Sequence, residues 1–374
     1  MWVRSCTAAM VFSMLGLAAE GAPTYLGADL SYVNELEDCG VRYFENGKQR
    51  DPFELLGEKG ANLSRVRLWN EATWTRYSNL ADVKKTIARS RAAGMEVLLN
   101  FHYSDDWADG DKQIIPVGWA AIEDVDTLAE TLYRFTLDTL LELHADGLMP
   151  ELVQVGNETN REILSTLAKA KEPIDWTRNA KLFNAGIRAV RDAGEKTGTR
   201  PRVMLHIAQP ENVEPWFEAA TKAGVVDFDL IGISYYRRWS SETIDGLIAT
   251  IRRLTQLYDA DVLVVEAAYP WTLESKDEMN NLLGTGTLIE GYPATPEGQR
   301  RYLIDVTQKV IGAGGVGLVY WEPAWISSSC KTRWGTGSSW ENATLFDFDG
   351  ELLPGADFFG FPYDYPAAPE HAKN

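Results

Sequence analysis

Two glutamates, each at the end of a short apolar run, are the residues of this chain whose type and position best suit a reaction. Glu158 follows the run 152–155 and its neighbour Asn157, and Glu266 directly follows the run 262–265. A lone Asn-Glu pair is as often an ordinary junction between a strand and a loop. Two strands that end on glutamate far apart in the sequence instead indicate a pair of carboxylates.

A pair of carboxylates can hydrolyse a glycosidic bond by dividing the work. One carboxyl group protonates the leaving oxygen, and the other attacks the anomeric carbon or activates a water molecule. The acid needs a raised pKa and the nucleophile must stay ionised, so neighbouring groups have to set the two pKa values apart. The chemistry that Glu158 and Glu266 indicate is therefore that of a glycosidase.

The strands that position these glutamates belong to a repeated pattern. Several runs are apolar almost without interruption, as in 97–99 and 262–265, which is typical of parallel strands buried on both faces. Eight strand-like runs occur in the chain: 25–30, 63–69, 95–101, 152–157, 203–207, 228–235, 262–266 and 316–321.

Helix-like segments with apolar residues at helical spacing lie between these runs. The alternation predicts an α/β fold, a single (β/α)8 TIM barrel that occupies residues 23–374. The longest connections, 101–124 after the third strand and 322–374 after the eighth, are expected to be binding loops, because both emerge at the face that carries the glutamates. The clearest helix-like segments are 81–93, 124–145, 176–193, 241–258 and 295–310.

Polar side chains at other strand ends are the expected neighbours of the glutamates. Alternation along the second strand directs Arg65 and Arg67 toward the barrel interior, with Arg67 nearer the mouth. A buried arginine at the position of Arg67 needs a carboxylate partner, and we expect Glu266 to be that partner. A histidine at a strand end is more often a hydrogen-bonded structural residue than a functional one, but strand-end placement favours function. The further candidates are Asn157, His102, His206 and Tyr235.

Tryptophans are the second candidate group, since the chain has 13 of them and most fall at strand ends or in the loops that follow. A tryptophan inside a strand usually packs in the core. Around an acidic pair, however, indole rings suit the C–H faces of sugars, while polar side chains take the hydroxyl groups. We therefore expect the loop tryptophans as a group to bind a carbohydrate, with Trp107, Trp271 and Trp321 as the main candidates. The tryptophans at strand ends or in the following loops are Trp69, Trp107, Trp119, Trp239, Trp271, Trp321, Trp325, Trp334 and Trp340.

The net charge of −18 limits the partners. It disfavours nucleic acid and anionic membrane surfaces, and it makes a polyanionic substrate unfavourable. A neutral polysaccharide and a monomeric protein are the expectation.

The first 22 residues have the features of a secretory signal peptide, namely an early arginine, a short apolar run and small residues near its end. We therefore expect a secreted or periplasmic protein. Removal of this segment leaves Cys39 and Cys330. They follow the first and eighth strands, which are neighbours in a closed barrel, so we predict a disulfide between them, with two free thiols as the alternative.

Five runs together resemble the endo-β-1,4-galactanases of glycoside hydrolase family 53, and the resemblance extends over nearly all of the chain that remains after residue 22. The runs are 27–32 (Gly-Ala-Asp-Leu-Ser-Tyr), 101–109 (Phe-His-Tyr-Ser-Asp-Asp-Trp-Ala-Asp), 153–160 (Val-Gln-Val-Gly-Asn-Glu-Thr-Asn), 265–271 (Val-Glu-Ala-Ala-Tyr-Pro-Trp) and 320–325 (Tyr-Trp-Glu-Pro-Ala-Trp).

The resemblance implies a retaining enzyme that cuts internal β-1,4 bonds of galactan, the side chains of pectin, with Glu158 as acid/base and Glu266 as nucleophile. It also implies that certain residues contact the sugar next to the cleaved bond: Asn157, His102, Asp106 or Asp105, and Trp321. Some relatives carry a calcium loop rich in Asp and His after the seventh strand. Here residues 273–281 have a lysine in their middle. We expect no cofactor, and calcium is the alternative.

Two other readings remain open. A related barrel glycosidase acting on mannan, xylan or cellulose would share both glutamates, but it is not expected to share the run 101–109. A non-catalytic carbohydrate-binding barrel would not need both Glu158 and Glu266, and an assay for released reducing sugar separates it from an enzyme.

Overall fold

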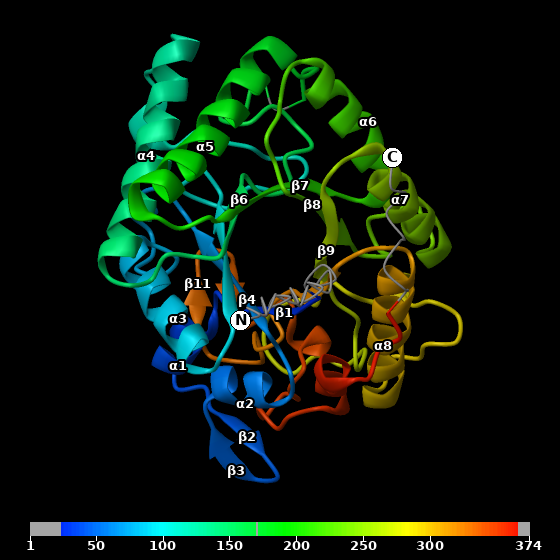
Figure 1. Cartoon of the computed structure of the whole chain (residues 1–374). Helices are drawn as coiled ribbons and strands as arrows, with labels where there is room; N and C mark the ends of the chain where they lie inside the picture. The colour runs from blue at the N-terminus through cyan, green and yellow to red at the C-terminus, as the bar shows by residue number, and fades with distance from the viewer. Residues whose placement is uncertain (1–23, 170, 366–374) are drawn as a thin grey trace, which may run out of the picture.

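Eight parallel strands close into a barrel in the computed structural model, which describes residues 24–169 and 171–365. Each strand pairs with its neighbour in chain order, and the first pairs with the last, Tyr25 lying opposite Gly317. Figure 1 shows the ring of strands with helices outside it. The strands are β1 (Tyr25–Asp29), β4 (Leu63–Leu68), β5 (Glu96–Phe101), β6 (Leu152–Val155), β7 (Arg202–Ala208), β8 (Leu230–Tyr235), β9 (Asp261–Ala267) and β10 (Gly317–Tyr320).

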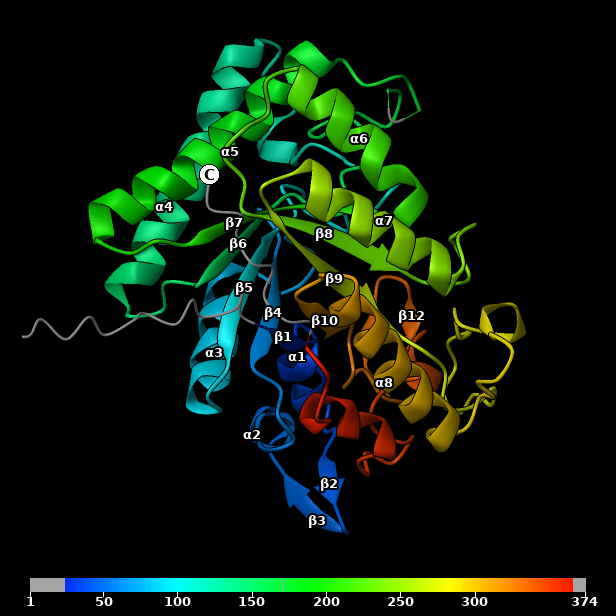
Figure 2. The same cartoon turned by 45° about the vertical axis from the view of Figure 1, so that its right-hand side comes forward.

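Helices between the strands form the outer layer, as the view in Figure 2 also shows. Most of them begin where an Asn, Asp or Thr side chain accepts a backbone N–H of the first turn, which satisfies a donor that the helix itself leaves free. The outer helices are α3 (Leu80–Ala92), α4 (Val125–Ala145), α5 (Trp176–Thr197), α6 (Pro210–Lys222), α7 (Ile244–Leu257) and α8 (Pro296–Gly312).

Side chains alternate along each strand between two hydrophobic layers. Inside the barrel, leucine, valine and methionine side chains fill the lower part, among them Leu63, Leu98 and Met204. Outside it, the alternate residues pack against the helices, as Ile231 and Ile233 do. Packed hydrophobic side chains therefore fill the barrel below the polar residues of its mouth.

Smaller elements surround the first and last strands. The connection from β1 to β4 holds α1 (Val33–Asp38), α2 (Pro52–Glu58) and the hairpin of β2 (Tyr43–Glu45) and β3 (Lys48–Arg50), which projects at the bottom of Figure 1. After β10 the chain forms a second hairpin, and up to residue 365 no α-helix closes the last repeat. The elements after β10 are β11 (Lys331–Thr332), β12 (Gly335–Thr336) and the 3-10 helices η3 (Glu341–Ala343) and η4 (Pro354–Gly360). Two further 3-10 helices lie earlier in the chain, η1 (Val117–Trp119) between β5 and α4, and η2 (Thr285–Thr287) between β9 and α8.

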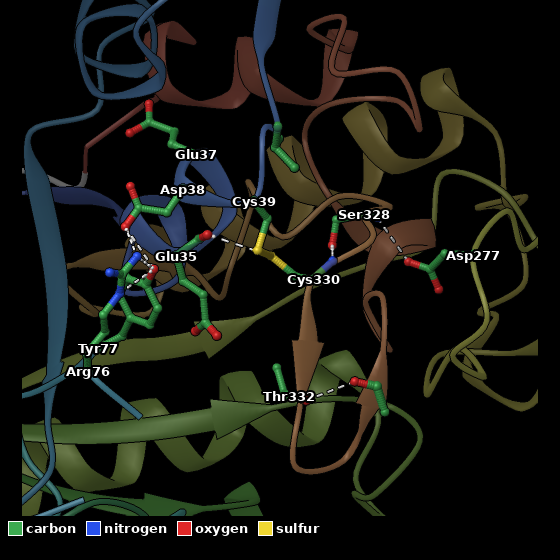
Figure 3. The surroundings of a disulfide bond; sticks show 12 residues. Glu35, Glu37, Asp38, Cys39, Arg76, Tyr77, Asp277, Ser328, Cys330 and Thr332 are labelled. Atoms are coloured by element: carbon green, nitrogen blue, oxygen red, sulfur yellow. Dashed lines mark hydrogen bonds and ion pairs between the residues drawn. A yellow bond between two sulfur atoms is a disulfide. The ribbon is translucent and has the colours of Figure 1, made fainter. Parts of the chain in front are cut away.

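A disulfide joins Cys39 to Cys330, with their Cα atoms 5.5 Å apart, and confirms the predicted pairing. Cys39 ends α1, and Cys330 immediately precedes β11, so the bond fastens the connection after β1 to the segment after β10 (Figure 3). The bond joins residues that are 291 positions apart, and the long loop that it closes restricts the unfolded state.

The predicted fold class is confirmed, and each of the eight expected strands lies within one or two residues of a barrel strand. The helix α6 was missed, because it has no side-chain cap and carries prolines at 210 and 215, which usually mark helix boundaries. The proposed signal peptide lies outside the described residues. Among the described helices, none is long and apolar enough to cross a membrane.

Candidate active site

Glu158 and Glu266 meet at the mouth of the barrel, as their positions after β6 and near the end of β9 require. One carboxylate oxygen of each lies within 4.8 Å of the other. Retaining glycosidases hold their two carboxyl groups about 5–5.5 Å apart, whereas inverting enzymes need roughly 6.5–9.5 Å. The arrangement is therefore close enough for direct attack on a sugar between the two groups.

The backbone that presents Glu158 is in an unusual conformation. Gly156 has φ 84° and Glu158 has φ 44°. A Cβ on Gly156 would lie 2.5 Å from Cγ2 of Thr159, so only glycine fits there. For Glu158, the left-handed region costs roughly 1–3 kcal/mol, and the surrounding contacts must supply that energy. Tyr103 and Glu322, which also follow barrel strands, share this backbone region, so strain gathers at the mouth.

Glu266 is buried and is held by two donors. Nη1 of Arg65 lies 2.8 Å from Oε1, and the hydroxyl of Tyr236 donates to Oε2 at 3.0 Å. Both contacts favour the ionised carboxylate and fix its direction. Each oxygen still has a free lone pair, so the group can act as a nucleophile.

Arg65 connects Glu266 to the rest of the mouth. Its guanidinium donates to Asp29 (2.9 Å), to Oε1 of Gln154 (3.1 Å) and to Oδ1 of Asn157 (2.6 Å). Residues from β1, β4, β6 and β9 thus share one buried cation. Because Asn157 precedes Glu158, this cation orients both sides of the site.

The expected partnership of Arg67 with Glu266 is wrong. Arg67 instead lies 3.3 Å from Oε1 of Glu322, and its guanidinium stacks on the rings of Tyr32, Trp69 and Trp107 at 4.2–4.7 Å. Arg65 reaches Glu266 from one layer lower, because an arginine side chain spans the height between two inward positions of a strand. Arg67 supports the aromatic surface and does not line the cleft.

The environments of the two glutamates differ in the way that acid and nucleophile require. Burial and the nearby charge of Glu266 raise the pKa of Glu158 to about 8. Burial also raises the pKa of Glu266, but Arg65 and the Tyr236 hydroxyl oppose this rise by stabilising its charge. Glu158 has no arginine within ion-pair distance in the described structure. It is therefore the better proton donor of the two.

Both strand-end histidines are buried and support the site from behind. The backbone N–H of Ala108 donates to Nδ1 of His102 at 3.2 Å. His206 lies 2.8 Å from Oγ of Ser234 through Nε2, and its Nδ1 lies 3.2 Å from Oδ1 of Asn157. Burial, reinforced by nearby arginine charge, lowers the pKa of both rings well below the usual value, so both are neutral. Neither histidine lines the cleft.

An aromatic cleft of about 1310 Å³ runs over the two glutamates. The predicted residues Trp107, Trp321 and Asn157 line it, together with other tryptophans of the expected loop group. The side chains of Trp239 and Trp334 are 43% and 40% exposed, which leaves ring faces free for a ligand. Trp325 and Trp340 of the same group also line the cleft, and so do Trp176 and Trp216, which were not predicted. A cleft of this size admits several sugar units.

The remaining predicted residues lie outside the cleft lining. Asp105 accepts the backbone N–H groups of Glu71 and Val117 at 2.8 Å and so organises its loop. Asp106 pairs with Lys112 at 3.2 Å, close to the cleft wall.

Tyr235 and Trp271 are also turned away from the cleft. Tyr235 is fully buried, and its hydroxyl donates to the carbonyl oxygen of Glu242 at 3.3 Å. Trp271 donates to the carbonyl oxygen of Glu341 at 3.2 Å and packs on Phe348.

Tyr236 and Arg65 contact Glu266, and neither was predicted from the sequence as a residue of the site. The period of two along β8 could have identified Tyr236. Small residues at 232 and 234 face the crowded barrel interior, whereas Ile231, Ile233 and Tyr235 face the helices. Position 236 therefore continues the inward series.

The described residues offer one group of side chains close enough to share a metal ion: Glu158, His206 and Glu266. This group fits an ion poorly, since Arg65 already neutralises Glu266 and both ring nitrogens of His206 have polar partners. The loop 273–281 is held by Glu341, which lies outside it. The fully buried carboxylate of Glu341 accepts the backbone N–H groups of Lys276 (2.7 Å) and Asp277 (3.2 Å) in this loop.

Comparison with known proteins gives the family. The model of glycosyl hydrolase family 53 matches residues 25–359. An arabinogalactan endo-β-1,4-galactanase of Cellvibrio japonicus is 51% identical over 351 residues, which cover 94% of this chain and 93% of that protein.

Two solved structures agree with this assignment. The family 53 catalytic domain of Ignisphaera aggregans has a TM-score of 0.81 at 32% identity, and the match covers 90% of this chain and 96% of that domain. A fungal β-1,4-galactanase has a TM-score of 0.77 at 29% identity, with 91% and 99% covered. The resemblance expected from the sequence is confirmed, and the chain belongs to glycosyl hydrolase family 53.

Proposed function

We propose that this protein is a retaining endo-β-1,4-galactanase that cuts the galactan of type I arabinogalactan, the side chains of pectin. The observation that carries the proposal is the short distance between Glu158 and Glu266. One carboxylate oxygen of each lies within 4.8 Å of the other, and both residues line the aromatic cleft. The names of the relatives supply the substrate class, since the Cellvibrio japonicus protein is an arabinogalactan endo-β-1,4-galactanase.

In the first step Glu266 attacks the anomeric carbon while the glycosidic bond breaks. The leaving oxygen takes the proton of Glu158, whose raised pKa keeps it protonated at neutral pH. A covalent galactosyl ester on Glu266 results. Arg65 and Tyr236 stabilise the carboxylate before attack and when it leaves again.

In the second step water replaces Glu266 on the same carbon. The carboxylate of Glu158 now accepts a proton from the water, and the new C–O bond forms as the ester bond breaks. Both glutamates return to their starting states, and two inversions at one carbon give net retention.

The remaining parts of the proposal concern substrate contacts and location. Trp107, Trp321 and Asn157 line the cleft and are assigned to sugar binding, with His102, His206 and Arg67 supporting them from behind. The net charge of −18 favours a neutral polysaccharide over nucleic acid or an anionic membrane. We further propose a secreted or periplasmic monomer that needs no cofactor, in keeping with a disulfide that oxidising compartments preserve.

The test is digestion of unbranched β-1,4-galactan, with products sized over time and proton NMR of the first reducing ends. Internal cleavage and an initial β-anomer are expected. Glu266→Ala should abolish hydrolysis, and Glu158→Ala should be milder on substrates with a good leaving group. An initial α-anomer contradicts retention, and preferred cleavage of mannan, xylan or cellulose contradicts the substrate assignment. Absence of released reducing sugar from every glycan would instead favour a binding protein.

A further inference from the structure

We propose that Gln113, in the connection between β5 and α4, is a positioning residue for Glu158. The inference rests on the proposed role of Glu158 as acid/base. It concerns how that side chain is held in place, which the strand itself does not determine, because β6 ends at Val155.

The side-chain amide of Gln113 is buried, with 3% exposure, and faces three backbone carbonyl oxygens. Its Nε2 lies 2.8 Å from the oxygen of Asp109, 2.8 Å from that of Asn157 and 3.1 Å from that of Glu158. Three acceptors require the NH2 end of the amide to point at them. Two hydrogens serve three carbonyls, so one hydrogen is shared.

Two of these carbonyls flank the φ angle of Glu158, which is 44°. Gln113 therefore donates hydrogen bonds to the peptide groups on both sides of a residue in the left-handed region. Without these hydrogen bonds, Glu158 can relax toward negative φ, and its carboxyl group then moves away from Glu266.

Other contacts hold Glu158 itself and the chain beyond it. The N–H of Glu158 donates to Nδ1 of His206 at 3.2 Å, and its carbonyl oxygen also accepts the N–H of Asn160 at 2.7 Å. The N–H of Thr159 donates to the carbonyl oxygen of His206 at 2.8 Å, and the side chain of Asn160 bonds to both backbone groups of Ala208. These contacts restrain the following residues against β7. Among the described contacts, Gln113 is the side chain that donates to the carbonyls of Asn157 and Glu158.

Gln113 is itself firmly placed. The N–H of Ser165 donates to its carbonyl oxygen at 2.8 Å, and the N–H of Ile115 donates to Ser165 at 2.9 Å. The connection after β5 is thus paired with the connection after β6. Because Gln113 also binds the carbonyl of Asp109, it links the cleft wall 107–111 to the acid/base.

The chain offers a matched control. Gln299 is fully buried, and its Nε2 likewise faces three oxygens, those of Tyr269 (2.8 Å), Thr344 (2.9 Å) and the hydroxyl of Tyr320 (3.2 Å). It lies in α8 and does not line the cleft. Gln299→Leu removes the same number of buried hydrogen bonds as Gln113→Leu, without touching Glu158.

The experiment compares two rates in the full-length protein. One is kcat on galactan, which needs a proton from Glu158, and the other is the pre-steady-state release of dinitrophenolate from an aryl β-galactobioside, which does not. Gln113→Leu should lower kcat on galactan by about 10–100-fold, since a displacement near 1 Å can have that effect. Dinitrophenolate release should stay within about threefold of wild type, as expected when only proton donation is lost.

In the control Gln299→Leu, both rates should fall slightly and by similar factors. Equal losses on the two substrates in Gln113→Leu, or a pattern like that of Gln299→Leu, would overturn the inference. Failure of the proposed function gives a different result, in which Glu158→Ala slows both substrates equally or the wild type leaves galactan intact.

Should Gln113→Leu not fold, Gln113→Glu gives a second measurement. A protonated glutamic acid can still donate one hydrogen bond to the carbonyls, whereas a carboxylate repels them. Its galactan activity relative to wild type should therefore fall as pH rises. A ratio independent of pH would count against the role of Gln113.

Discussion

Arg65 contacts Glu266 at 2.8 Å through Nη1 and, through Nη2, donates to Asn157 at 2.6 Å. One buried cation therefore touches the proposed nucleophile and the residue just before the proposed acid/base. The same guanidinium also pairs with Asp29 at 2.9 Å. Its charge opposes the rise that burial causes in the pKa of Glu266, whereas the nearby charge of Asp29 adds to that rise.

Replacement of Arg65 should therefore affect both stability and the pH profile. Arg65→Leu leaves Asp29 and Glu266 buried without a cation, which should lower the free energy of unfolding by about 3–5 kcal/mol. The pKa of Glu266 should rise further, and since the nucleophile must be ionised, the acid limb of kcat/KM should move to higher pH. Urea unfolding and a pH profile measure the two effects.

Arg67→Leu is the matched control for this change. It also removes a buried ion pair, with Glu322, and should destabilise the fold, but it leaves the contacts of Glu266 intact. Its acid limb should stay where it is in the wild type. A shift of equal size in both variants would mean that Arg65 does not tune Glu266 directly.

Trp321 should matter for the sugar, and Trp271 for the loop alone. Trp321 lines the cleft beside Trp107 and Trp340, with ring centroids 6.0 and 4.6 Å away. Trp321→Ala should lower kcat/KM on galactan roughly 30-fold, a loss of about 2 kcal/mol in transition-state stabilisation, with the fold retained. Trp271→Ala should leave kcat/KM near the wild-type value. Steady-state kinetics and circular dichroism decide between them, and normal kinetics in a folded Trp321→Ala protein would assign this ring to packing.

Glu158 should make the protein less stable as pH rises. Its pKa is about 8 in the folded protein, against 4.5 for a free group. Between these values the folded protein holds a proton that the unfolded chain has lost, so stability falls with increasing pH across this window and levels off above it. Glu158→Gln removes the effect and should be more stable than wild type by about 1 kcal/mol or more near pH 8.

Scanning calorimetry at several pH values measures this difference. The advantage of Glu158→Gln should be small near pH 5 and should grow as pH rises. Glu172→Gln, a change at an exposed position, should show no such trend. A difference that is constant with pH would show that Glu158 does not carry a raised pKa.

Loss of the disulfide should weaken the fold and disturb substrate binding. Cys39→Ser with Cys330→Ser should lower the free energy of unfolding by about 2–5 kcal/mol. The hairpin of β11 and β12 follows Cys330 and carries Trp334, which lines the cleft, so KM should rise more than kcat falls. Reductant should have this effect on the wild type and no further effect on the double variant. An unchanged melting temperature would show that the bond adds little.

The sequence predicted the barrel well because its signals are local. Continuous apolar runs mark buried parallel strands, and Asp124, Asp175 and Thr295 mark helix starts where the structure has them. The glutamates at strand ends were found for the same reason, since closure of the barrel brings all strand ends to one face.

Partner assignments inside the mouth were harder to predict, because they depend on reach and not on order along the chain. Arg65 and Arg67 face the same way, and only the three-dimensional arrangement shows that Glu322 takes Arg67 while Asp29 and Glu266 share Arg65. Gln113 lies in an irregular connection without periodicity, so nothing in its sequence context indicated its contacts with Asn157 and Glu158.

The pairing of β1 with β10 has a consequence for synthesis of the chain. Because the first and last strands meet, the barrel has no closed form until β10 has been made, and every shorter nascent chain exposes two open sheet edges to solvent. At the junction a Cβ on Gly317 would lie 1.9 Å from the carbonyl oxygen of Tyr25, so a larger residue would keep the strands apart. Closure of the barrel, and with it protection from edge-to-edge aggregation, depends on this late glycine.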